Sequence, residues 1–368
     1  MEHKKIRAIG TIFLVVVWVA LTAFSWFGPA NDISTAERRP LKQWPGITWE
    51  TLFNGKFMKD FESYGLDQFP LRDAFREIKS LYHYYVMQYS DNNGIYIADG
   101  YAAKQEYPLN LQGLEHALKR FNHLYEKYMK EQGSQVVTAV IPDKGYYLAE
   151  ENGYLALDYE ALFDKVQQQM PWSTHVDLTG LLSIEDYYYT DTHWRQENLL
   201  PVANALSQAL GVTLPDADDF TKVKLEKPFY GVYYGQAALP MSGEDMYLME
   251  SQLLNDCTVF NYEDKSTSSV YNMDKIDGLD MYEVYLSGSL SLLTINNPNA
   301  TTDKELIIFR DSFGSSVAPL LVQDYKTVTL VDIRYIFSDM LDKHIDFHGQ
   351  DVLFLYSTLV LNNGTTLK

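Results

Sequence analysis

Apolar residues along the chain follow two spacings, and segments of the two kinds alternate. Short apolar runs have the length and composition of strands buried in a parallel sheet. They are 136–141, 306–309, 327–331 and 352–356, with a shorter strand at 174–177. Segments with helical spacing are 51–64, 71–89, 111–130, 159–169, 196–210, 314–322 and 336–341. The alternation predicts an α/β fold, a mostly parallel sheet flanked by helices on both faces.

The region from about 220 to 293 departs from this alternation. It is rich in tyrosine and glycine, and its 281–286 segment alternates apolar and polar residues with the period of a strand. We expect a β-rich insertion there. A short strand is also expected at 95–98, after the turn residues of 91–94.

The N-terminus carries a different pattern. Residues 8–27 contain no charge, and twenty helical residues span about 30 Å, the thickness of a bilayer core. Lys4, Lys5 and Arg7 precede the stretch, which predicts a single-pass anchor at 1–30 with a cytoplasmic N-terminus. Residues 31–48 then form a juxtamembrane linker, and 49–368 form an extracytoplasmic domain. The alternative is a cleaved signal peptide, whose apolar stretch is usually shorter.

Charge and cysteine content exclude several classes of protein. The chain has 30 basic and 49 acidic residues, a net charge of −19, which argues against binding nucleic acid. Its one cysteine, Cys257, rules out an intrachain disulfide and a cysteine-based metal site. The sequence contains no phosphate loop or dinucleotide fingerprint, and the spacing of His344 and His348 lacks the glutamate of a zinc protease motif. We therefore expect no cofactor and no metal.

Two segments carry candidate chemistry. Strand 306–309 ends at Arg310-Asp311-Ser312, where a helix is about to begin, so the Ser312 hydroxyl would face the loops beside free backbone N–H groups. The alternative is that Ser312 is a helix N-cap. In Asp191-Thr192-His193, side chains two apart point the same way in extended backbone, so the carboxylate could orient the imidazole. The alternative is a surface aspartate beside a structural histidine.

Together these segments resemble a known family. Residues 189–195 (Tyr-Thr-Asp-Thr-His-Trp-Arg) and 309–314 (Phe-Arg-Asp-Ser-Phe-Gly) are similar to motifs of the DHHW family, SGNH-hydrolase-like proteins related to the bacterial alginate and polysaccharide O-acetyltransferases. Segments 57–72, 95–101, 142–144, 332–335 and 356–358 are similar to further family motifs. The resemblance covers about 44–363. The first histidine of the family's DHHW motif is Thr192 here, and the Asp-x-His element precedes the serine, a permuted order.

The resemblance implies roles for particular residues. Ser312 would be the nucleophile, His193 its general base and Asp191 the orienting acid, and the Ser312 amide would donate to an oxyanion. Further candidates near strand ends could bind substrate or line the oxyanion site, with structural ion pairs and packing as the alternative. They are Arg310, Phe313, Arg334, Tyr335 and Tyr356.

The implied activity is O-acetyl transfer to a cell-surface or secreted polysaccharide through an acyl-serine. An acetylesterase with the same three residues is one alternative, and a non-catalytic assembly or binding protein is another. The resemblance also implies a multi-spanning membrane acyltransferase as acetyl donor. Because residues 31–368 carry 27 basic and 48 acidic residues, a neutral or cationic glycan suits the domain better than an anionic one.

Overall fold

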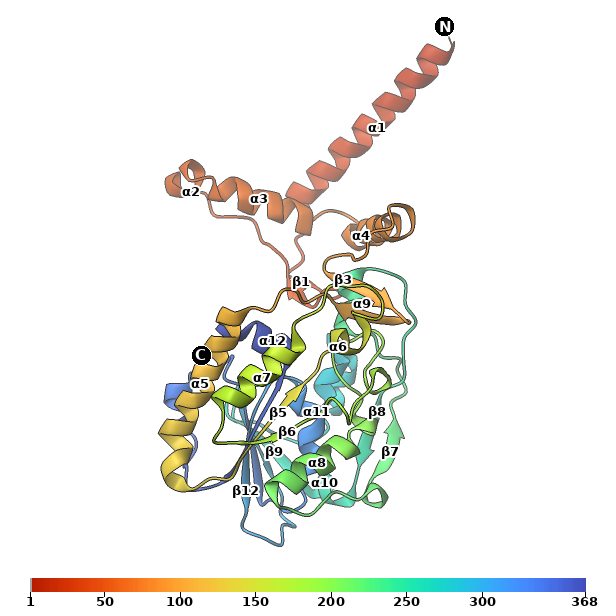
Figure 1. The fold of residues 1–368 in the computed structure, drawn as a ribbon. Coiled ribbons are helices and arrows are strands. Elements are labelled where there is room, and N and C mark those ends of the chain that lie inside the picture. The colour runs from red at the N-terminus through yellow and green to blue at the C-terminus, as the bar shows by residue number, and fades with distance from the viewer. Residues whose placement is uncertain (1) are drawn as a thin grey trace. The chain divides into compact units, whose positions relative to one another are not determined.

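The computed structural model describes residues 2–368, and its main sheet has eight strands (Figure 1). Five of them pair in parallel, and the other three extend one edge by antiparallel pairing. In sheet order they are β10 Thr267–Ser268, β9 Thr258–Asn261, β11 Leu292–Asn296, β13 Thr327–Val331, β12 Glu305–Arg310, β14 Asp351–Ser357, β5 Val136–Ile141 and β6 Thr174–Val176. The predicted mostly parallel sheet is confirmed.

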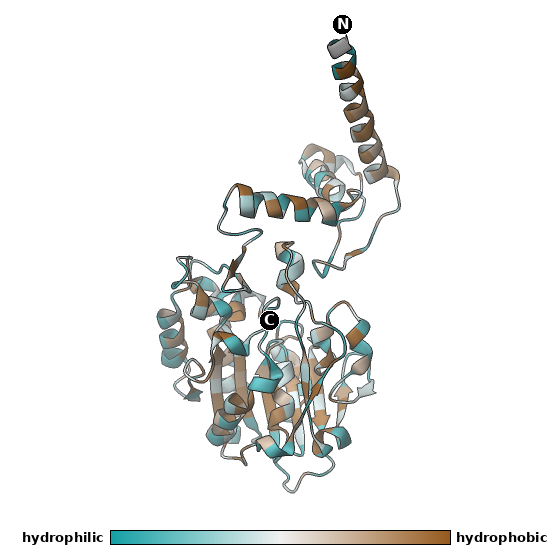
Figure 2. Cartoon of the chain, turned by 90° about the vertical axis from the view of Figure 1, so that its right-hand side faces the viewer, coloured by the Kyte–Doolittle hydropathy of each residue, from teal (hydrophilic) through white to brown (hydrophobic). Residues whose placement is uncertain are grey.

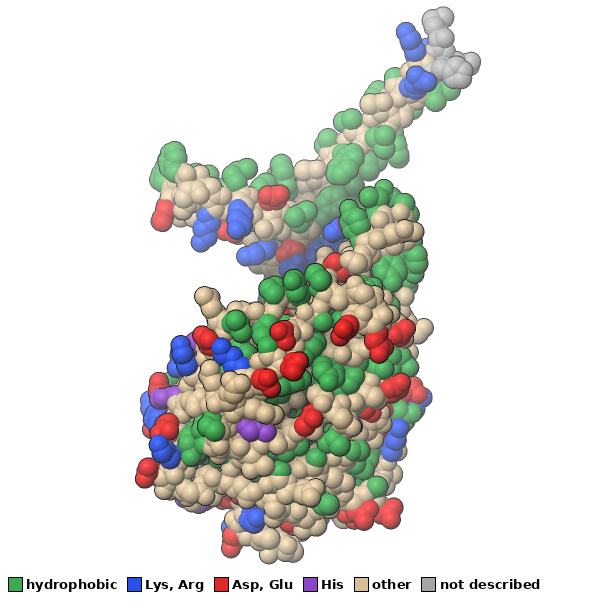
Figure 3. Space-filling model, in the orientation of Figure 1, with side chains coloured by type: hydrophobic (Ala, Val, Ile, Leu, Met, Phe, Trp, Pro, Cys, Tyr) green, Lys and Arg blue, Asp and Glu red, His purple; other side chains and the backbone are tan. Residues whose placement is uncertain are grey.

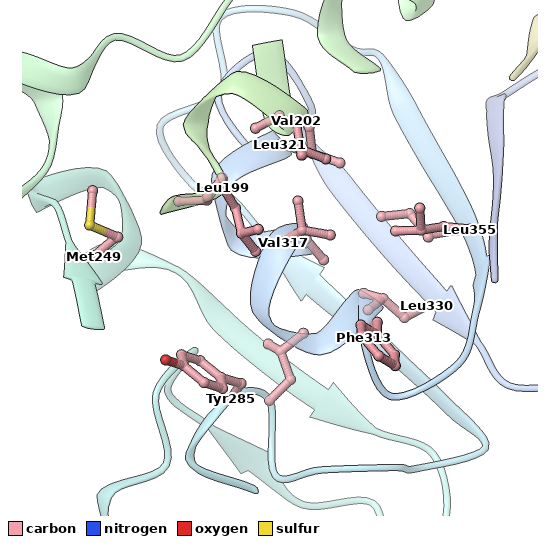
Figure 4. Close-up of a cluster of buried hydrophobic side chains, with 14 of the residues drawn as sticks. Leu199, Val202, Met249, Tyr285, Phe313, Val317, Leu321, Leu330 and Leu355 are labelled. Carbon is pink, nitrogen blue, oxygen red and sulfur yellow. The ribbon is translucent and has the colours of Figure 1, made fainter. Parts of the chain in front are cut away.

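Helices cover both faces of this sheet, as predicted. Side chains that alternate along β12 explain why, because Leu306 and Ile308 belong to one buried cluster and Ile307 and Phe309 to the other. The first cluster packs against α8 Leu200–Leu210 and α11 Gly314–Val317 (Figure 4), and the second against α5 Leu111–Leu124, α7 Tyr159–Gln169 and α12 Thr358–Asn362. The central strands accordingly appear mostly brown, or hydrophobic, in Figure 2.

The region 220–293 supplies the antiparallel edge of the main sheet through β9, β10 and the start of β11. It also forms a separate hairpin-like pair, β7 Thr221–Lys224 with β8 Tyr247–Glu250, and two short helices, α9 Val232–Ala237 and α10 Gln252–Asp256. Two 3₁₀ turns, Met273–Asp277 and Met281–Val284, complete it. The alternating 281–286 segment is therefore a turn rather than the strand its pattern indicates.

Several predicted helices are shorter than expected, each for a local reason. The segment 51–64 is divided into α2 Trp49–Phe53 and α3 Lys56–Asp67 by Gly55, which has a φ of +78°. Segment 314–322 is only one α-helical turn followed by a 3₁₀ turn, because Pro319 cannot donate within the helix. Segment 336–341 forms a 3₁₀ turn over Ser338–Lys343.

The chain divides into two compact units. One comprises residues up to 92 with 234–240, and the other comprises 93–233 with 241–368 and contains the main sheet. The first unit holds α1 Glu2–Phe27, α2, α3, α4 Arg72–Leu81 and the two-stranded sheet of β1 Ile33–Ser34 and β2 Arg39–Pro40. The second also holds α6 Lys144–Leu148 and the pair β3 Ile95–Ala98 and β4 Tyr101–Lys104.

Within α1, residues Lys4–Phe27 are long and apolar enough to cross a membrane, and almost none of this stretch is buried. A signal sequence near the N-terminus would meet the same criteria of length and composition.

Candidate active site

Ser312 lies two residues after the end of β12, on the turn that leads into α11. Neither Ser312 nor Ser315 caps this helix, because the N-cap residue is Phe313 and no side chain accepts a hydrogen bond there. The Ser312 hydroxyl therefore does not cap the helix. Ser312 is partly exposed, and the next residue, Phe313, is buried.

Asp311 fixes the turn that presents Ser312. Its carboxylate is fully buried and accepts hydrogen bonds from the Phe313 N–H (3.0 Å) and from the Ser357 N–H (2.8 Å) and hydroxyl (2.6 Å). Ser357 ends β14, the neighbouring parallel strand. The position of Ser312 is therefore set by its own strand and by the next strand in the sheet.

Asp191 and His193 lie in a bend closed by the Tyr187–Trp194 bridge, where an extended segment was expected. Asp191 Oδ1 accepts the backbone N–H of His193 at 3.0 Å, so the carboxylate itself shapes the bend. The two side chains still meet, because the bend brings His193 Nδ1 to 2.5 Å from Asp191 Oδ1.

The structure brings the three predicted residues into one hydrogen-bonded line. His193 Nε2 lies 2.7 Å from Ser312 Oγ, across 119 residues of sequence. Since the buried carboxylate of Asp191 can only accept when ionised, Nδ1 carries the proton and Nε2 is left to accept from the Ser312 hydroxyl. This is the arrangement in which an imidazole can take a proton from serine.

Aromatic rings hold the imidazole on two sides. The Tyr282 ring stacks on His193 with centroids 3.8 Å apart and planes 7° from parallel, and the Phe313 ring lies 4.9 Å away. The Trp194 indole N–H reaches both Phe313 O (3.1 Å) and Ser316 Oγ (2.8 Å). The histidine bend is thereby fastened directly to the serine turn.

The insertion contributes to the site from a second direction. The Val232 N–H donates to Asp191 Oδ2 at 2.8 Å, and the Gly231 N–H donates to Thr190 Oγ1 at 2.8 Å. A Cβ at Gly231 would lie 2.2 Å from Asp191 Cβ, so glycine is required for this approach. Glu244 supports the same bend by accepting from the Tyr189 and Thr190 N–H groups at 2.8 and 2.9 Å.

Sequence reasoning missed Tyr282, Val232, Glu244 and Asp311 as contributors to the site. The first three lie in the insertion, where the alternation at 281–286 predicts only a strand and no local signal connects them with Asp191 or His193. Asp311 had a usable signal. Three apolar strands are each followed, within two residues, by an aspartate that accepts a hydrogen bond from the N–H two positions further on. These aspartates are Asp143, Asp311 and Asp332.

The other predicted residues divide by exposure. Arg310 and Tyr356 are fully buried, which removes them from direct contact with a substrate, and Arg310 instead donates to Ser315 Oγ and Asp311 O. Phe313 is buried against His193 and Trp194. Burial of these three favours the packing alternative.

Arg334 and Tyr335 keep some solvent access. Arg334 forms a bidentate ion pair with the buried Asp332, with Nη2 2.6 Å from Oδ2 and Nε 2.9 Å from Oδ1. Its guanidinium lies over the Tyr335 ring, 5.4 Å from the centroid, and Tyr335 is 53% exposed. Tyr335 is thus the candidate with the most surface open to a ligand.

The Ser312 N–H has no hydrogen-bond partner within residues 2–368, while the Phe313 and Gly314 N–H groups are both occupied by Asp311. The Ser312 amide is therefore free to donate to an oxyanion. Across the same described residues, no group of three or more His, Cys, Asp or Glu side chains is arranged to hold a metal ion.

A buried lysine, Lys144, donates hydrogen bonds to the backbone just before the bend that holds Asp191 and His193. Lys144 Nζ donates to the Tyr188 carbonyl at 2.9 Å and lies 3.3 Å from the Tyr189 carbonyl. Burial lowers the pKa of the Lys144 ammonium to about 7, and the charge of Asp191 opposes that shift. A lysine in the unfolded chain has a pKa near 10.4, so over this interval the unfolded state binds more protons.

This difference predicts a pH-dependent stability. We expect the free energy of unfolding of the wild type, relative to Lys144→Met, to rise as the pH increases from about 7 to about 10 and to be nearly constant below about pH 6. Denaturant unfolding of both proteins in the same detergent at each pH measures this difference. A difference that stays flat across the whole range would contradict the buried, deprotonating lysine.

A serine, histidine and aspartate in one line at the carboxyl edge of a mostly parallel sheet define the class: an α/β protein with a candidate Ser-His-Asp triad. One family model matches part of the sequence, fewer than half of its residues. Residues 182–331 match the model of the DHHW protein family, a span that includes Asp191, His193 and Ser312. The predicted resemblance to this family is confirmed.

Solved structures agree on the fold. A DHHW family protein from Eubacterium siraeum has a TM-score of 0.60 at 19% identity, over 75% of this chain and 94% of that one. PatB1 of Bacillus cereus with a sulfonyl adduct has a TM-score of 0.56 at 18% identity, over 73% and 95%. PatB1 of Bacillus cereus without the adduct has a TM-score of 0.54 at 18% identity, over 73% and 96%. No curated protein matches the sequence.

Proposed function

We propose that the protein is a serine-dependent O-acetyltransferase that transfers an acetyl group to a polysaccharide outside the cytoplasm. The observation that carries the proposal is the line of two hydrogen bonds from Ser312 Oγ through His193 to Asp191, 2.7 and 2.5 Å long. The resemblance of the sequence motifs to polysaccharide O-acetyltransferases supports acetyl as the group transferred.

In the first step, Ser312 Oγ attacks the acetyl carbonyl while His193 Nε2 takes the hydroxyl proton. The carbonyl oxygen becomes an oxyanion that the Ser312 N–H can stabilise, and Asp191 stabilises the imidazolium. Collapse expels the donor's leaving group, which receives the proton from His193, and leaves an acetyl ester on Ser312.

In the second step, a sugar hydroxyl gives its proton to His193 Nε2 and attacks the acetyl-serine. Collapse of the new tetrahedral intermediate returns the proton to Ser312 Oγ and releases the O-acetylated sugar. Water in place of the sugar would make the protein an acetylesterase, so the outcome depends on which acceptor occupies the site and on exclusion of water.

The proposal places the catalytic domain on the outer side of the membrane, held by α1 as an uncleaved anchor. A donor for acetyl must then be available outside the cytoplasm, and a multi-spanning membrane acyltransferase is the partner we propose. The acidic domain favours a neutral or cationic polysaccharide as acceptor, because long-range repulsion would keep an anionic polymer away.

The test is to trap the acetyl-enzyme. Full-length protein in detergent is mixed with p-nitrophenyl acetate, quenched in acid and digested, and we expect one acetyl group on the peptide that contains Ser312. In unquenched reactions, neutral oligosaccharides should become acetylated in preference to uronate oligomers. Acetate as the sole product would favour the esterase, and absence of acetyl on Ser312 would favour a non-catalytic binding protein.

A further inference from the structure

The helices that follow α1 expose many large apolar side chains. Seventeen such residues between 33 and 89 are exposed, against thirteen in the described stretch from 93 to 368, which is nearly five times as long. In Figure 3, hydrophobic side chains gather along one side of α2 and α3 and around α4. Soluble proteins rarely leave such patches uncovered, and in natural proteins they mark surfaces for partners or membranes.

In α4 the polar face is buried and the apolar face is exposed, the opposite of a surface helix in a soluble protein. The side chains of Arg72 and Arg76 on one face are only 15% exposed and both pair with Glu37, and Ser80 on the same face is buried. The apolar face is open to solvent, with Ile78 62% exposed. That open face continues through the π-turn Tyr82–Val86 and carries Phe75, Ile78, Tyr82, Tyr85 and Val86.

α3 is joined to the end of the apolar helix α1. Ser25 Oγ donates to Gly65 O at 3.1 Å, and the Trp26 and Phe61 rings lie 5.4 Å apart. Met58, near the start of α3, is exposed. If α1 crosses a bilayer, α3 therefore lies at the level where the chain leaves the hydrocarbon.

Charge separates this region from the rest of the chain. Residues 28–92 carry eight basic and nine acidic residues, whereas residues 93–368 carry 19 and 39. An anionic lipid surface would repel the second region and leave the first unaffected. The exposed side chains also include Trp49, Tyr82, Tyr85 and Tyr89, the residue types that concentrate at membrane–water interfaces.

We propose that α2, α3 and α4 with the π-turn after it, residues 49–89, form a collar that lies in the interfacial layer of the bilayer. The proposal rests on α1 being a membrane anchor, as in the proposed function, but not on the chemistry at Ser312. The occupant of the apolar face is phospholipid at the boundary of headgroups and acyl chains, as in other interfacial helices. The collar would hold the first unit flat on the membrane rather than on a free stalk.

The test uses the full-length protein in vesicles of phosphatidylcholine and phosphatidylglycerol, with no other protein. An environment-sensitive fluorophore is attached at one cysteine at a time, in pairs of an apolar residue and its charged neighbour about 100° around the helix. The pairs are Met58→Cys with Lys59→Cys, and Ile78→Cys with Glu77→Cys. Val15→Cys in α1 reports on the anchor. The native Cys257 is buried and burial raises the pKa of its thiol to about 11, so it reacts slowly at neutral pH.

We expect spin-labelled lipids to quench the labels at 58 and 78 several-fold more than those at 59 and 77, and aqueous iodide to give the opposite order. If the label at 15 is quenched by lipid but those at 58 and 78 remain open to iodide, the anchor holds and the collar is overturned in favour of a protein partner. If none of the three is quenched by lipid, both anchor and collar are overturned. Acetylation of Ser312 in the same vesicles is scored separately, so its failure is distinguishable from either result.

Discussion

Ser312→Ala should lower the hydrolysis of p-nitrophenyl acetate about 10⁴-fold or more and abolish acetylation of the protein. The reason is that the substitution removes the attacking oxygen while leaving the rest of the site in place. Within residues 2–368, the only hydrogen-bond partner of the Ser312 hydroxyl is His193. Loss of the hydroxyl should therefore lower the free energy of unfolding by about 1 kcal/mol or less. The measurement is steady-state turnover, with circular dichroism to check the fold.

Ser315→Ala is the matched control. Ser315 lies three residues further along the same turn and helix, but its hydroxyl contacts Arg310 and Gly288 rather than His193. We expect this variant to keep activity within about tenfold of the wild type, since only a supporting hydrogen bond is lost. Equal loss in the two variants would indicate damage to the turn, and retained turnover in Ser312→Ala would remove Ser312 as the nucleophile.

Asp191→Asn should lower kcat by about 10³- to 10⁴-fold at neutral pH, with a smaller change in KM. The Asp191 carboxylate accepts from His193 Nδ1, the His193 N–H and the Val232 N–H at once. Asparagine has only one acceptor oxygen. Its NH₂ group would replace a carboxylate oxygen that now accepts an N–H, so two donors would face each other. The imidazole would then turn or adopt the other tautomer, with a proton on the nitrogen that must accept from Ser312.

Asp158→Asn makes the same chemical change where it should not matter. Asp158 is the N-cap of α7, where it accepts the Ala161 N–H, and asparagine caps helices about as well as aspartate. Turnover and unfolding of this variant should match those of the wild type. If Asp191→Asn keeps more than about a tenth of wild-type kcat, the carboxylate does not orient the histidine.

The parts of the fold predictable from sequence are those whose signals are local. A strand buried on both faces, such as β5 or β12, must be apolar throughout, so it appears as a continuous run. Ser312 and the Asp191–His193 pair were recognisable as candidates because each lies in a short segment at the end of an element, and the resemblance to the family supplied their roles.

The remainder depends on contacts between distant segments. The stacking of Tyr282 on His193 joins residues 89 positions apart, and the bond from Val232 to Asp191 joins residues 41 apart. No periodicity records such a contact, because the insertion is made of turns whose shape follows from packing. The sequence indicated an extended backbone at Asp191, whereas the hydrogen bond from the His193 N–H to Asp191 Oδ1 bends it.

The two contacts made by the insertion also limit how this chain can be shortened or recombined. A truncated protein without 220–293 would keep Ser312, His193 and Asp191 but would lose the Val232 N–H on the acid and the Tyr282 ring on the base. Gly231 and Asp191 fit together so closely that exchanging the insertion with that of a relative would require a glycine at the same place. The insertion and the Asp-x-His bend should therefore be inherited, and engineered, as a single module.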